Sequence, residues 1–160
     1  MKKSVLALVS VTFLLGIARP PAAEAAQVFT STLRGNVANQ VIAGFPSSVV
    51  TWTIERGRVT IDRQKSGVAV VVINTHHLII PALGFNPSPD LLARIVCHDS
   101  AGIASEAART RAVPFAESGN ARLVDTVSLP EECFAPIVLL TGSIDPQGES
   151  PGKFFAVSGF

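Results

Sequence analysis

The stretch VVTWTIERGRVTID, residues 49–62, indicates the class of fold. In its first half Val50, Trp52 and Ile54 alternate with polar residues, and in its second half Val59 and Ile61 do the same. Such alternation places the apolar side chains on one face of a β-strand. The glycine between the two runs predicts a turn, so we interpret the stretch as a β-hairpin.

Similar short runs continue along the chain, separated by turn-forming clusters at residues 65–67, 85–90, 118–120 and 145–152. Further strands are predicted at residues 28–33, 68–74, 76–80, 93–98, 109–117, 121–129, 135–142 and 153–160. Residues 102–110 are compatible with a helical turn as well as with a strand. Short, evenly spaced strands without long helical patterns predict an all-β fold. We expect an antiparallel β-sandwich, immunoglobulin-like or jelly-roll-like, with a small β-barrel as the alternative.

One predicted strand, VAVVVI at residues 68–73, is apolar on both faces. Val68, Val70 and Val72 share one face, and Ala69, Val71 and Ile73 share the other. A half-exposed strand normally carries polar residues on its outer face, so one face needs a cover. We expect the loop at residues 81–89 to cover Ala69, Val71 and Ile73, because its Leu83 and Phe85 need burial of their own. The alternative cover is a partner chain, and the covering loop predicts a monomer.

The N-terminus has the pattern of a secretory signal peptide at residues 1–25. Two lysines precede an apolar run at residues 5–17, and Ala23-Glu24-Ala25 supplies the small residues of a cleavage site. The apolar run is too short to span a bilayer comfortably. We therefore expect a secreted protein, extracellular or periplasmic, with one mature domain at residues 26–160 and no stable membrane insertion after cleavage.

Charge excludes several classes of partner. The predicted mature chain carries 10 basic and 11 acidic side chains, and no basic run is interleaved with aromatic residues. The sequence therefore lacks the basic patch that binding to nucleic acids requires, and the same absence argues against binding to anionic membranes. With 48% apolar and 16% charged residues, the chain is also predicted to fold rather than to be disordered.

The chain contains one pair of cysteines, Cys97 and Cys133. An even pair behind a signal peptide predicts a disulfide bond, here closing a loop of about 37 residues. Cys97 and His98 are adjacent on a predicted strand and point to opposite faces, so they are not expected to form a thiol–imidazole pair. Ser100 lies outside any nucleophile-elbow motif, and the segment around it predicts a polar turn.

The remaining candidate chemistry rests on a few side chains. His76, His77, His98 and Asp99 could build a metal centre or a small hydrolase site, although no HxH or HExxH spacing is present. Glu131 and Glu132 are expected at a solvated strand entry. Trp52, the only tryptophan, shares a face with apolar residues and is predicted to be a core residue rather than a carbohydrate platform.

The segments WTIERGRV, LPEECFAPIVLL and KFFAVSGF resemble those of small secreted bacterial proteins with a tryptophan strand, paired cysteines and a hydrophobic final strand. The resemblance implies a β-rich secreted domain and carries no catalytic residue across. The function predicted from the sequence is a non-enzymatic binding or surface-associated module without a cofactor, whose ligand or surface partner is unknown. The alternative is the secreted hydrolase or metal-dependent enzyme built on the three histidines and Asp99.

Overall fold

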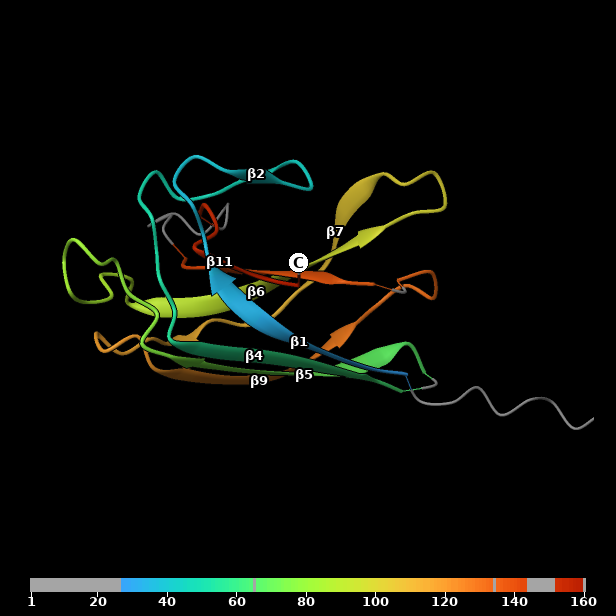
Figure 1. Ribbon diagram of the computed structural model, residues 1–160. Helices are drawn as coiled ribbons and strands as arrows, with labels where there is room; N and C mark the ends of the chain where they lie inside the picture. The colour runs from blue at the N-terminus through green and yellow to red at the C-terminus, as the bar shows by residue number, and fades with distance from the viewer. Residues whose placement is uncertain (1–26, 65, 134, 144–151, 160) are drawn as a thin grey trace, which may run out of the picture.

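The computed structural model describes residues 27–64, 66–133, 135–143 and 152–159 of the 160-residue chain. The predicted signal peptide lies outside the described residues. The described part is all β (Figure 1). Its strands are β1 (Gln27–Gly35), β2 (Val41–Ile42), β3 (Phe45–Pro46), β4 (Arg56–Arg63), β5 (Val68–His76), β6 (Asp90–His98), β7 (Ala104–Arg109), β8 (Val113–Pro114), β9 (Ala121–Ser128), β10 (Ile137–Thr141) and β11 (Ala156–Ser158).

Nine of these strands form one continuous antiparallel sheet that nearly closes into a barrel. Its order is β7-β6-β10-β11-β1-β4-β5-β9, and β8 pairs with β6 beside this path. Strand β1 joins the two halves, because its first residues pair with β4 and its last residues pair with β11. In Figure 1, β4, β5 and β9 lie in one layer, β6 and β11 lie in the other, and β1 crosses between them. The predicted all-β antiparallel class is confirmed, and the barrel alternative is compatible with the continuous sheet.

The barrel interior holds the main core. In β5, Ala69, Val71 and Ile73 are fully buried, and in β9 the alternation buries Leu123 and Val127. Fully burying a valine, leucine or isoleucine side chain contributes about 1.5–3 kcal/mol each, so the alternating pattern directs these strands into the interior. The period-two prediction therefore holds for β4, β5 and β9, which form the most regular part of the sheet.

A second, smaller core lies on the outer face of β6, β10 and β11. The hairpin β2–β3 covers this face, and its Ile42 packs with Val96, Leu139, Phe154 and Val157. These three strands are thus buried on both faces, which explains why β6 and β10 are almost continuously apolar. The guanidinium of Arg94 in β6 lies over the Phe45 ring, 4.4 Å from its centroid, and adds a cation–π contact to the hairpin.

The predicted cover of the strand at residues 68–73 is wrong. Ala69, Val71 and Ile73 face the barrel core instead of needing a loop. The outward valines of β5 are only partly exposed, because β5 is a central strand whose neighbours shield them; Val72, for example, pairs with Thr60 in β4 and with Val124 in β9. The loop at residues 81–89 lies elsewhere and leaves Leu83 and Phe85 exposed.

The predicted hairpin at residues 49–62 is also wrong in its first half. Residues 49–55 form no regular strand and make only an isolated bridge, between Thr53 and Ile79, while Gly57 lies inside β4. A side chain at position 57 would collide with Leu33 and Ile54. The glycine therefore permits close packing across strands and makes no turn, which is the other common role of glycine in a strand.

Two further segments differ from the sequence patterns. Residues 102–110, which were compatible with a helical turn, contain strand β7. Of the predicted strand at residues 109–117, only the short β8 forms. Its neighbour Phe115 turns into the core, where its ring stacks on Phe155 at a centroid distance of 6.0 Å.

An ion pair links β9 to the segment that follows β7, across the gap at which the sheet fails to close. The backbone N–H of Arg111 and its guanidinium both donate hydrogen bonds to the Asp125 carboxylate, at 2.7–3.1 Å. The side-chain hydrogen bonds lower the pKa of Asp125 to about 2, although burial acts in the opposite direction.

This pair predicts an acid-dependent loss of stability. The pKa of Asp125 is lower in the folded chain than the value of about 3.9 expected after unfolding, so the pair stabilises the fold above about pH 4. That stabilisation is lost as the pH falls towards 2. We expect Asp125→Asn to remove about 1 kcal/mol at pH 7 and to flatten the decline below pH 4 in urea-unfolding midpoints. The exposed Asp62 provides the control, because Asp62→Asn should retain the wild-type decline.

The strand registers define two ends of the barrel. At the disulfide end, β4 finishes at Arg63, β5 begins at Val68 and β6 finishes at His98. At the opposite end, β5 finishes at His76 and β6 begins at Asp90. The long β5–β6 loop, lime in Figure 1, projects from this opposite end.

Candidate functional site

The three histidines do not converge. His76 and His77 lie at the opposite end of the barrel, whereas His98 lies at the disulfide end. His76 Nδ1 is 3.1 Å from the Glu55 carboxylate, and both side chains are about half exposed. His77 adopts a φ of 55°, and its backbone N–H donates to the Asn120 side chain in a neighbouring loop. The strand topology therefore separates residues that the sequence grouped as one candidate site.

Asp99 has a local structural role. Its Oδ1 accepts hydrogen bonds from the backbone N–H groups of Ala101 and Ile103, at 2.9 and 2.8 Å, and so shapes the turn between β6 and β7. Ser100 is an exposed residue of the same turn. Within the described ranges no three histidine, cysteine, aspartate or glutamate side chains gather closely enough to hold a metal ion. The alternative enzyme site is therefore not assembled by this fold.

The remaining sequence candidates fall into structural positions. Glu131 and Glu132 are exposed in the loop between β9 and β10. Trp52 is a core residue, as predicted: it is 5% exposed, and its ring stacks on Phe155 at 4.6 Å. Its indole face is therefore not available as a carbohydrate platform.

The predicted disulfide is formed. Cys97 in β6 is bonded to Cys133 in the β9–β10 loop, with 5.2 Å between the Cα atoms. Both residues are buried, and Cys97 packs in the main core. The bond ties the loop that leaves β9 to the opposite half of the sheet.

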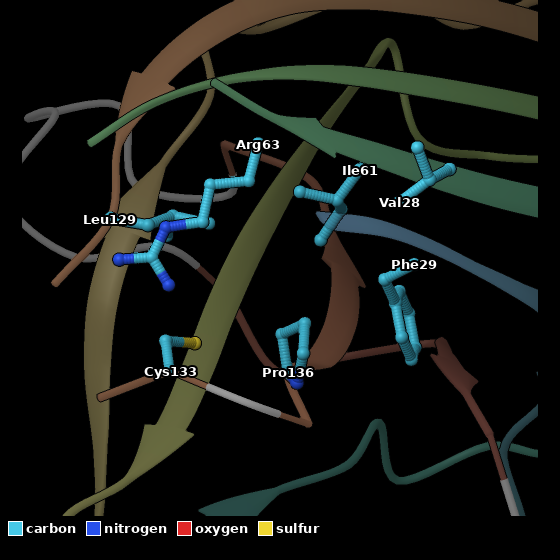
Figure 2. A pocket seen from close by; sticks show the side chains of 7 residues that line it. All are labelled: Val28, Phe29, Ile61, Arg63, Leu129, Cys133 and Pro136. Atoms are coloured by element: carbon cyan, nitrogen blue, oxygen red, sulfur yellow. The ribbon is translucent and has the colours of Figure 1, made fainter. Parts of the chain in front are cut away.

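A small pocket opens beside this disulfide. It has a volume of about 90 Å³, and Figure 2 shows most of its lining side chains around a common space, whereas the Val28 side chain points away from it. Six lining residues are apolar or disulfide-bonded and one is basic: Val28, Phe29, Ile61, Leu129, Cys133, Pro136 and Arg63. They come from β1, β4 and the β9–β10 loop, so the pocket forms only when the sheet curves round at the disulfide end.

The loop wall of the pocket is fixed at two points. The Arg63 guanidinium donates hydrogen bonds to the carbonyl oxygens of Pro130 and Glu131, at 2.7 and 3.0 Å. Two residues further on, Cys133 is held by its bond to Cys97. These contacts hold the loop in place before any ligand arrives, which is the condition that most binding sites meet. The disulfide thus shapes this pocket as well as linking the two halves of the sheet.

No protein-family model, no curated protein and no solved structure matches this chain. In the part of the chain that the structure describes, no helix has the length and apolar character needed to cross a membrane.

Pocket size limits what the site can hold. Apolar cavities of about 150 Å³ accept benzene, and sites for drug-sized ligands occupy about 300–1,000 Å³. A pocket of about 90 Å³ is smaller than both and matches one aliphatic side chain. Its apolar lining favours burial of such a group, whereas the arginine at its edge is already engaged with backbone carbonyls.

Most of the pocket was not identified from the sequence. Cys133 was recognised as a disulfide partner, and Val28 and Phe29 as part of a predicted strand, but neither pattern indicates a pocket. Arg63 carried the only usable signal, since it is a basic residue at the end of a strand beside a predicted turn. Its partners are backbone carbonyls 67 and 68 residues away, and sequence spacing does not reveal such contacts.

Proposed function

We propose that the protein is an exported, disulfide-stabilised, non-enzymatic binding module whose site is the pocket at the disulfide end. The observation that carries this proposal is the pre-formed apolar pocket, held by Arg63 and by the Cys97–Cys133 bond. Small-molecule turnover has no comparable support, because the histidines lie at two ends of the barrel and Asp99 is used by its own turn.

The preferred ligand is a protein segment that inserts a single aliphatic side chain. A site of about 90 Å³ is too small to enclose a metabolite, yet it suits an anchor residue of the kind that dominates protein interfaces. The exposed Glu131 and Glu132 precede Cys133 in the loop wall, and the basic Arg63 lines the pocket, so charges of both signs lie near its rim.

Export is part of the proposal and rests on the signal-peptide pattern together with the disulfide, which is typical of oxidising compartments. Intact-mass measurement of secreted protein should give a chain that begins at Ala26 and is lighter than the reduced chain by two hydrogen atoms. A full-length chain retained with the membranes would contradict export.

The binding site can be tested with N-acetyl-leucinamide as a minimal probe. Burial of one leucine side chain predicts weak binding, with a Kd on the order of 10–100 mM, which NMR titration can detect. Phe29→Lys places a charge in the pocket wall and should weaken binding about tenfold. Phe29 is only partly buried, and circular dichroism checks that the variant remains folded.

The matched control is Val124→Lys. Val124 is 49% exposed on β9, outside the pocket lining, so the variant adds the same charge to the same sheet without touching the site. It should bind the probe like the wild type. Equal weakening of probe binding in both variants, or unchanged probe binding in both, would contradict the assignment of the pocket.

A further inference from the structure

The rim of the pocket carries one positive charge that no ion pair neutralises. Arg63 is the only charged residue in the pocket lining. None of the ion pairs within the described residues includes its guanidinium. Glu131 and Glu132 are exposed in the loop wall, and Asp62 points to the other face of β4. The guanidinium therefore presents its charge at the pocket without a carboxylate partner from the described chain.

The same guanidinium has hydrogen-bond donors to spare. An arginine side chain carries five N–H donors in a fixed planar fork. Its bonds to the carbonyl oxygens of Pro130 and Glu131 use two of them, and within the described residues the side chain makes no other hydrogen bond. In Figure 2 the guanidinium lies on the same side of the pocket as Leu129 and Cys133. The two bonds fix the group at the rim and leave its remaining donors available to a ligand.

The size of the pocket determines which part of a ligand meets these donors. A volume of about 90 Å³ holds the side chain of an anchor residue, so its Cα and the groups bonded to the Cα stay at the rim. In an internal residue the neighbouring group is a neutral peptide carbonyl. In the last residue of a chain it is a carboxylate, attached to the Cα by a bond of about 1.5 Å. Arginine binds carboxylates through charge-assisted hydrogen bonds that are about twice as strong as neutral ones.

We infer that the ligand of the pocket is the C-terminal residue of a partner protein, with its aliphatic side chain in the pocket and its α-carboxylate on Arg63. The inference rests on the proposed function, because it specifies the position of the anchor residue in the partner. Arg63 then acts twice: two N–H groups hold the loop wall, and the others bind the carboxylate. Capture of a chain terminus by fixed donors is one of the recurring modes of peptide recognition.

Two matched probes test the inference. N-acetyl-leucine and N-acetyl-leucinamide differ only in the terminal group, which is a carboxylate in the first and a neutral amide in the second. In NMR titrations at neutral pH, N-acetyl-leucine should bind about three- to tenfold more tightly. Equal binding of the two probes would overturn the inference and leave the proposed function intact. Absence of binding by both probes would overturn the proposed function as well.

The ratio of the two affinities identifies the role of Arg63. In Arg63→Gln this ratio should fall to about one, because the carboxylate loses its charged partner. A merely structural role in holding the loop would weaken both probes equally and preserve the ratio, which would contradict the inference. Arg122→Gln is the matched control, since it removes the same charge from an exposed position at the opposite end of the barrel. It should keep the wild-type ratio, and loss of the ratio in both variants would overturn the contact with Arg63.

A third probe separates a chain terminus from a free acid. 4-Methylpentanoate has the side chain and the carboxylate of leucine but lacks the amide nitrogen through which a chain continues. N-acetyl-leucine should bind at least as tightly, because its amide group leaves the pocket at the rim. Clearly tighter binding of 4-methylpentanoate would assign the pocket to a free aliphatic acid and overturn the inference.

Discussion

Phe155→Ala should lower the free energy of unfolding by about 3–5 kcal/mol, the range found when a buried aromatic residue is truncated. Phe155 is 1% exposed, and its ring stacks between Trp52 and Phe115 at centroid distances of 4.6 and 6.0 Å. Its backbone also links the two halves of the sheet: its N–H donates to Leu140, and its carbonyl accepts from Asn36. Loss of the ring leaves a cavity between aromatic neighbours that the sheet cannot collapse to fill.

Urea unfolding followed by tryptophan fluorescence measures this loss, because Trp52 reports on the same stack. Phe85→Ala provides the matched control. It removes the same ring from the β5–β6 loop, where Phe85 is 42% exposed, and should change the free energy of unfolding by less than about 0.5 kcal/mol. A loss below about 1 kcal/mol for Phe155→Ala would contradict the aromatic stack as the centre of the core.

Cys133→Ser should cost about 2–5 kcal/mol, the typical effect of removing a native disulfide from a small secreted domain. The bond closes a loop with a sequence separation of 36, so its loss returns conformational freedom to the unfolded chain. Reduction of the wild type should reproduce the loss in thermal unfolding, and reductant should have no further effect on the variant. Two titratable thiols in unreduced, unfolded wild type would contradict the bond.

The same substitution links the disulfide to the pocket. Cys133 lines the pocket and anchors its loop wall, so the folded variant should also bind N-acetyl-leucinamide more weakly than the wild type. Unchanged probe binding would limit the disulfide to a role in stability.

Local patterns predicted the regular half of the sheet well. In β5 and β9 the period of two reflects burial directly, because each strand has one face on the core. The disulfide followed from the even pair of cysteines together with the signal-peptide pattern. Burial on both faces was predicted for residues 68–73, whereas β6 and β10 are the strands that are buried on both faces. The hairpin β2–β3 that covers them is too short to be recognised in the sequence.

Tertiary contacts account for the errors. Residues 49–55 alternate like a strand, but Trp52 donates its backbone N–H to Asn36, and Thr53 pairs with Ile79, so no single neighbouring strand is present. The burial of Leu83 and Phe85 was expected from their hydrophobicity, which carries no information about where a loop points. The pocket was unpredictable for the same reason, because its lining comes from three segments that only the curvature of the sheet brings together.

We propose that the pocket at the disulfide end binds an aliphatic side chain. Intermolecular nuclear Overhauser effects between isotope-labelled protein and unlabelled N-acetyl-leucinamide test it most directly. We predict contacts from the leucine methyl groups to Phe29, Ile61 and Leu129, which line the pocket. Contacts confined to other residues, or the absence of any contact at saturating probe, would contradict the claim.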